Sequence, residues 1–146
     1  MIKILFAEDN PVNRELLREL LEMREYTVFE ACNGQEALDM IDETQPDILL
    51  LDLGMPVLDG IATVKQIREN PRLQHLPVLA VTAYAMRGDR ERILSSGFDG
   101  YLSKPISPTT LFGELDRLLK LRNGSTEEDY SNKERSVSSS AAARGA

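Results

Sequence analysis

The sequence predicts an α/β protein built around a parallel sheet. Short apolar stretches alternate with longer amphipathic ones along most of the chain, which is the pattern of repeated strand and helix units. The run at 48–51 is Ile-Leu-Leu-Leu and does not alternate with polar residues, as expected of a central parallel strand covered on both faces. At 146 residues, the chain has the length of one ordinary domain.

Five such units are predicted. The strands are expected at 2–7, 27–31, 48–53, 78–82 and 100–103. Four of the predicted helices begin with a recognisable signal, either an N-cap residue or a proline at the first helical position. These signals are Pro11, Asn33 with Glu36 as its reciprocal partner, Asp59 and Ser107-Pro108. The remaining helix is shorter and is expected from about Asp89 to Ser95, with Gly97 near its carboxyl end. We therefore expect residues 1–122 to form the folded domain.

The segment 123–146 differs in composition from the rest. It is rich in Ser, Glu, Lys and Ala and has few large apolar side chains, so burial cannot offset its ordering entropy. We expect a flexible tail there, which is either a natural linker or an expression remnant. The sequence leaves these two alternatives open.

Charge and cysteine content exclude some classes of function. The net charge of −7 argues against a broad nucleic-acid surface, and no apolar run reaches membrane-spanning length. Cys32 is the single cysteine, so no internal disulfide forms, and it is expected to be a small buried hydrophobe. We expect a cytoplasmic protein that contacts neither membrane nor DNA directly.

Polar residues lie at or directly after the carboxyl ends of four of the five predicted strands. They are Glu8-Asp9, Asp52, Thr82 and Lys104-Pro105. In an open parallel sheet the carboxyl ends of the strands form the ligand site, so these side chains are expected to converge. Three carboxylates in one crevice repel each other unless a cation neutralises them, and Mg²⁺ prefers such oxygen ligands. Singly, each residue is an ordinary turn, cap or loop residue, whereas together they indicate a site for metal and phosphate.

The motifs around these residues resemble the receiver domain of two-component response regulators. The series is Glu8-Asp9-Asn10, then Asp52-Leu53-Gly54-Met55-Pro56 with Asp59-Gly60, then Val81-Thr82-Ala83, then Tyr101-Leu102-Ser103-Lys104-Pro105. It extends over residues 2 to about 121, with every signature in the expected order. The resemblance implies a doubly wound, flavodoxin-like (βα)₅ fold with five parallel strands in the order 2-1-3-4-5.

The resemblance also assigns roles. Asp52 would accept the phosphoryl group, and Glu8, Asp9, Asp52 and the backbone carbonyl of Gly54 would hold Mg²⁺. Lys104 would contact the phosphoryl oxygens, and the bond from Lys104 to Pro105 is expected to be cis, as is typical of receivers. The hydroxyl of Thr82 would move to meet the phosphoryl group, and Tyr101 would be the aromatic switch residue that turns inward with it.

These roles agree with the chemistry of phosphoryl transfer. That reaction needs in-line positioning and cations around the moving oxygens, and a carboxylate nucleophile gives an acyl phosphate that water hydrolyses. We therefore predict a signalling phosphoacceptor and not an enzyme in the usual sense. Two other classes fit less well. A haloacid dehalogenase phosphatase needs an Asp where Gly54 lies, and the acids of Glu8-Asp9 would repel the phosphate of a flavodoxin-like cofactor binder.

Partners are required because the chain offers no donor of its own. His75 is the single histidine and falls in a predicted loop, whereas a donor histidine lies on an exposed helix, so a histidine kinase or histidine phosphotransfer protein is expected. By analogy with receivers, Asn13, Arg14 and Leu17 are candidates for donor docking.

The predicted fourth helix is charged. It is either a solvated face or part of an output surface toward a downstream protein, and its charged residues are Arg87, Asp89, Arg90, Glu91 and Arg92. A stand-alone regulator and a module of a hybrid kinase both remain open, as does the effect of Gly54 and Tyr84 on the phosphoryl lifetime.

Overall fold

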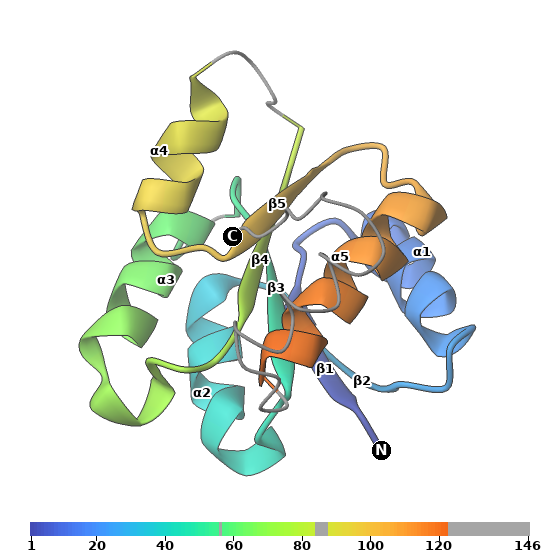
Figure 1. Ribbon diagram of the computed structural model, residues 1–146, viewed down its shortest axis with the longest axis horizontal. Coiled ribbons are helices and arrows are strands. Elements are labelled where there is room, and N and C mark those ends of the chain that lie inside the picture. Colours follow the sequence, from blue (N-terminus) through green and yellow to red (C-terminus); the bar gives the residue numbers. More distant parts are fainter. Residues whose placement is uncertain (56, 84–87, 123–146) are drawn as a thin grey trace, which may run out of the picture.

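The computed structural model describes residues 1–55, 57–83 and 88–122, which form a parallel sheet between two layers of helices (Figure 1). The strands are β1 (Lys3–Ala7), β2 (Thr27–Ala31), β3 (Ile48–Asp52), β4 (Val78–Thr82) and β5 (Gly100–Ser103). The helices are α1 (Pro11–Glu22), α2 (Gly34–Thr44), α3 (Gly60–Glu69), the short 3₁₀ helix η1 (Pro71–Leu73), α4 (Asp89–Ser95) and α5 (Pro108–Arg122). The interpretations of Pro56, Tyr84, Arg87 and the tail at 123–146 lie outside the described residues.

The strand order confirms the predicted topology. The five strands are parallel and lie in the order β2-β1-β3-β4-β5. The chain passes from β1 to one edge of the sheet and then returns to the other side of β1 as β3, and this reversal opens a crevice at the carboxyl ends of both strands. Ala7 is the register partner of Leu51, so Glu8 and Asp52, which come next, are neighbours at that edge.

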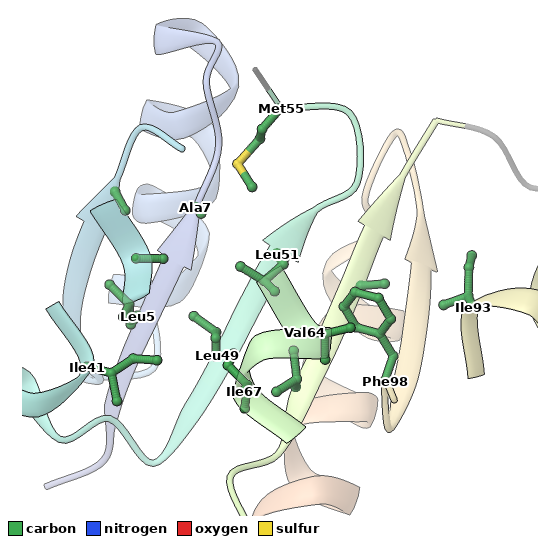
Figure 2. Close-up of a cluster of buried hydrophobic side chains, with 14 residues drawn as sticks. Leu5, Ala7, Ile41, Leu49, Leu51, Met55, Val64, Ile67, Ile93 and Phe98 are labelled. Atoms are coloured by element: carbon green, nitrogen blue, oxygen red, sulfur yellow. The ribbon is translucent and has the colours of Figure 1, made fainter. Parts of the chain in front are cut away.

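Alternate residues of the strands form a separate core on each face of the sheet. Ile4 and Phe6 face α1 and α5, whereas Leu5 and Ala7 face the layer of α2, α3 and α4, as Figure 2 shows for the second cluster. Every residue of β3 is buried, in agreement with its prediction as a central strand. A fully buried Leu contributes about 1.5–3 kcal/mol, so the two cores fix the sheet on which the site is built.

Side-chain caps fix the points at which the helices begin. The Asn33 side chain accepts a hydrogen bond of 2.8 Å from the Glu36 amide, and Asp59 accepts one of 2.8 Å from Ala62. The reciprocal bond of Glu36 was assigned wrongly, because its carboxylate accepts from the amide of Cys32 and not from that of Asn33. Both predicted caps are thus confirmed, and each fixes the approach of a helix to the sheet.

The expectation of a buried Cys32 was wrong. Cys32 is exposed, because it follows the last residue of β2 and lies where the chain turns toward the cap of α2.

In the described part of the chain, no helix has the length and apolar character needed to span a bilayer.

Arg68 ties the amino edge of the sheet to the end of α4. Its guanidinium donates to the Gly97 carbonyl at 2.9 Å and to the Leu76 carbonyl at 2.8 Å. It also forms an ion pair with Asp99 at 2.9 Å, and the same carboxylate accepts from the amide of Val78 at 2.8 Å. These bonds hold α3, β4 and the turn between α4 and β5 together.

The first turn of α3 lies against the end of β3. A Cβ atom added to Gly60 would lie 2.7 Å from the carbonyl oxygen of Asp52 and 3.0 Å from the Cα of Leu53. These neighbours belong to the backbone and cannot rotate away, so only glycine allows α3 to begin directly behind Asp52.

The substitution Gly60→Ala is expected to lower the free energy of unfolding by about 1–3 kcal/mol, because the new methyl group overpacks against the backbone. Gly113→Ala in α5 is the matched control, since a Cβ there meets nothing within 4 Å. That variant should be more stable by about 0.5–1 kcal/mol, as alanine is favoured over glycine in a helix. Urea unfolding measures the free energy of unfolding of both variants. Equal effects of the two substitutions would contradict the close approach at Gly60.

Candidate functional site

The predicted acidic residues converge at the carboxyl edge of the sheet. Glu8 and Asp9 follow β1, and Asp52 is the last residue of β3. One carboxylate oxygen from each of the three lies within 4.8 Å of the others. The switch in strand order between β1 and β3 therefore places three negative groups in one crevice.

Glu8 and Asp52 are buried and held by the backbone, whereas Asp9 is exposed at the mouth of the crevice. One oxygen of Glu8 accepts from the Asn10 amide at 3.1 Å. One oxygen of Asp52 accepts from the Gly54 amide at 3.2 Å. Each buried carboxylate thus has a fixed orientation and one further oxygen directed elsewhere.

Lys104 provides the counter-ion for both buried carboxylates. Its Nζ atom lies 2.9 Å from Oε1 of Glu8 and 3.2 Å from Oδ2 of Asp52. The backbone amide of Lys104 donates to the Thr82 carbonyl at 2.8 Å, which places this residue directly beyond the paired ends of β4 and β5. The Lys104–Pro105 bond is cis, as the resemblance to receivers implied.

The pKa values follow from this arrangement. Burial raises the pKa of Glu8, and the charge of Asp52 raises it further, although the hydrogen bonds from Lys104 and Asn10 oppose both. For Lys104, burial lowers the pKa, but the hydrogen bond to Glu8 and the charges of Asp52 and Glu8 outweigh it and raise the pKa overall. Lys104 is therefore held as a cation, and burial more than the neighbouring acid makes the ionised form of Glu8 costly.

The donor set fits a hard divalent cation. Three carboxylates and one ammonium leave two negative charges in the crevice, and the candidate ligands are oxygen atoms, as Mg²⁺ prefers. Gly54 is exposed, and a Cβ placed there meets nothing within 4 Å, so the entrance beside Asp52 is open. Glu8, Asp9 and Asp52 can therefore hold such a cation without rearrangement of the sheet.

The other predicted site residues lie on the neighbouring strands. Thr82 is the last residue of β4, is buried, and pairs in register with Ser103. Thr82 and Gly54 line one hollow between α3 and α4, with a volume of about 540 Å³. Tyr101 in β5 is half-buried and packs against the core on the side of α2, α3 and α4.

A groove of about 390 Å³ runs from this site along α1. The residues that line it are Glu8, Asn13, Leu16, Leu17, Glu19, Leu20, Met23, Lys104, Pro105, Ile106 and Pro108. Among the candidates for donor docking, Asn13 is exposed in this groove, whereas Leu17 is mostly buried in the core. Leu16 and Met23 are the large hydrophobic side chains of the groove that are exposed, although the sequence predicts neither of them as a docking residue.

Two residues that support the acidic loop were not recognised from the sequence. Asn10 caps α1 through its side chain, with bonds of 2.9 and 3.0 Å from Val12 and Asn13, while its amide holds Glu8. Arg14 donates to the backbone carbonyls of Glu8 and Asp9, whereas the analogy with receivers predicts only a docking role for it. The signal for Asn10 was available, because an Asn before Pro11 is a typical N-cap.

Comparisons with known proteins agree with this geometry. The family model of the response regulator receiver domain matches residues 4–116. The chain is 43% identical over 104 residues to the polar-differentiation response regulator DivK of Brucella anthropi, a match that covers 71% of this chain and 85% of that protein.

Solved structures give the same result. The receiver domain of a sensor histidine kinase from Pseudomonas aeruginosa, with a magnesium ion coordinated in its active site cleft, has a TM-score of 0.75 and 35% identity, covering 81% of this chain and 97% of that one. The chemotaxis response regulator CheY4 of Vibrio cholerae has a TM-score of 0.75 and 30% identity, covering 81% of this chain and 98% of that one.

In the metal-free protein, the stability of Glu8→Gln relative to the wild type is expected to increase as pH rises. Because the folded state raises the pKa of Glu8, its stability contribution is complete below the ordinary glutamate pKa of about 4.3 and is lost as pH rises through the raised value. Glutamine stays neutral, so the variant avoids this pH-dependent loss, but its single carbonyl oxygen accepts from Lys104 or from the Asn10 amide and not from both.

Melting temperatures in EDTA between about pH 4 and about pH 8 test this prediction. The advantage of Glu8→Gln over the wild type should grow as pH rises, whereas Glu69→Gln on the exposed face of α3 should follow the wild type. A difference that stays constant with pH would contradict the assignment.

Proposed function

The chain belongs to the family of response regulator receiver domains, and we infer that Asp52 is its phosphoryl acceptor in two-component signalling. The observation that supports this most strongly is the meeting of three carboxylates with one lysine at a single sheet edge. Both oxygens of Asp52 are held in place, one by the Gly54 amide and the other by Lys104.

Mg²⁺ is the cation that we propose for this site. Glu8, Asp9, Asp52 and the backbone carbonyl of Gly54 would hold it, directly or through water. When bound, the ion supplies positive charge to the phosphoryl oxygens and to the crowded acids. The two negative charges that remain after Lys104 is counted match a divalent ion.

The reaction then follows from the chain's own groups. A carboxylate oxygen of Asp52 attacks the phosphorus of a phosphohistidine, the bond from phosphorus to nitrogen breaks, and the imidazole leaves with the electron pair. Lys104 exchanges its contact with Asp52 for a phosphoryl oxygen, since its Nζ is within 3.2 Å of the acceptor already. Water later hydrolyses the acyl phosphate, so the protein promotes both its phosphorylation and its dephosphorylation.

The change in shape would begin at the ends of β4 and β5. We propose that the hydroxyl of Thr82 moves toward the phosphoryl group and that Tyr101 turns inward as it does so. Their positions on neighbouring strands support this, because Thr82 pairs with Ser103, two residues after Tyr101. The surface that changes would then be read by a downstream protein partner.

The donor is a histidine kinase or a histidine phosphotransfer protein, which we propose docks a helix in the groove along α1. Glu8 and Lys104 line both this groove and the acceptor site, so a helix lying there brings its histidine close to Asp52. The net charge of −7 favours protein partners over nucleic acid. We expect these encounters to take place in the cytoplasm, without a membrane contact.

Incubation with Mg²⁺ and a small acyl phosphate should add one phosphoryl group to the wild-type chain, and Asp52→Asn should abolish the addition. Mass spectrometry of the intact protein detects it, and EDTA should suppress it because the oxygens of the acids alone repel the donor. Asp59→Asn is the matched control, since Asn also caps a helix and Asp59 caps α3. Wild-type labelling of Asp52→Asn would contradict the assignment.

Leu16→Glu tests the groove independently of the acceptor. Leu16 is 55% exposed, so the fold should tolerate the change, but a charge buried against a donor helix is costly. We expect kcat/KM for transfer from a phosphorylated donor protein to fall about tenfold, while labelling by the small acyl phosphate stays unchanged. Gln66→Glu on the exposed face of α3 should alter neither rate. Equal loss with both donors would exclude docking as the cause.

A further inference from the structure

Arg14 lies at an unfavourable place for a cation. It is the fourth residue of α1, near the amino end, where the helix dipole favours negative charge, and the first turn contains no acidic residue. A cation in this position therefore needs contacts that compensate for the dipole.

Those contacts lead to the acidic loop. Nη1 of Arg14 donates to the carbonyl oxygen of Glu8 at 2.9 Å and to that of Asp9 at 3.3 Å. Nε lies 3.5 Å from a carboxylate oxygen of Glu30 in β2, and only 20% of the Arg14 side chain is exposed. One guanidinium thus links the loop after β1 to the neighbouring strand.

The two carbonyls belong to the residues whose side chains hold the proposed cation. Fixing both peptide groups restricts the direction of each Cα–Cβ bond, so less conformational entropy is lost when the carboxylates gather around an ion. The amide of Glu8 is already bonded to the Ala31 carbonyl at 3.1 Å, which fixes the start of the loop. Arg14 fixes the part that follows.

We propose that Arg14 is a positioning residue that presets Glu8 and Asp9 for Mg²⁺ without touching the ion. The inference rests on the proposed function, because it takes Mg²⁺ as the ligand of these acids. The charge of Arg14 acts in the opposite direction, since a cation repels Mg²⁺. Glu30 reduces that repulsion by pairing with Arg14 and also with Arg18.

The opposite signs of the two effects make the proposal testable. Loss of positioning should weaken Mg²⁺ binding about tenfold, at the lower end of the range for groups that orient metal ligands. Loss of charge alone should strengthen it. Arg14→Ala removes both the anchor and the charge. Arg14→Lys keeps the charge but loses the rigid planar group whose Nη1 donates to both carbonyls while its Nε faces Glu30.

Calorimetric titration with MgCl₂ of the wild type, Arg14→Ala, Arg14→Lys and Arg18→Ala measures the affinity. Both Arg14 variants should bind about tenfold more weakly, and Arg18→Ala, which loses only a pairing with Glu30, should match the wild type. Amide hydrogen exchange in EDTA should be faster at Asp9 and Asn10 in Arg14→Ala, with exchange in β3 unchanged.

Three results would overturn the inference: unchanged or tighter Mg²⁺ binding by Arg14→Ala, wild-type affinity of Arg14→Lys, or a loss of affinity in all variants that parallels their melting temperatures. Absence of Mg²⁺ binding by the wild type would instead contradict the proposed function. Faster exchange in the loop of Arg14→Ala would then still establish the anchor.

Discussion

Repulsion among Glu8, Asp9 and Asp52 is the constraint on which the rest of the site depends. The fold gathers these acids by placing β1 beside β3, and it partly offsets their repulsion with Lys104 from the end of β5. Because β4 lies between β3 and β5, the lysine reaches over a whole strand to contact Asp52. The site therefore keeps two negative charges that Lys104 does not offset, and the proposed divalent cation would neutralise them.

Precise packing behind the site keeps these charges at fixed separations. Gly60 lets α3 begin against the backbone of Asp52, and Asn10 caps α1 while its amide holds Glu8. The acids thus lie at the junctions between strands and helices, where the backbone is bonded on both sides. The same contacts tie the ends of β1 and β3 to the first turns of α1 and α3.

The sequence predicted the strands well because buried parallel strands are continuous apolar runs, as at 48–51. Differences appear at strand ends: β1 begins one residue after the predicted start and β3 ends one before the predicted end. The Leu53 amide still donates to the Val81 carbonyl at 3.1 Å, so the pairing with β4 continues by one bond beyond the assigned end of β3.

The convergence of the acids could be predicted from the sheet topology alone. The contacts of Arg14 and the exposure of Cys32 could not be predicted in this way. The first depend on the conformation of a long side chain and the second on the path of the chain after β2, and local sequence patterns encode neither.

The bonds of Arg68 have a mechanical consequence for α4. They hold the turn that follows this seven-residue helix, at Gly97 and Asp99, while its amino end begins at Gly88 without a side-chain cap. A helix that is held at its carboxyl end and lacks a side-chain cap at its amino end changes its angle to the sheet more easily than its position along it. A movement at the carboxyl edge of the sheet would therefore rotate α4 about its carboxyl end, where Arg68 holds the following turn.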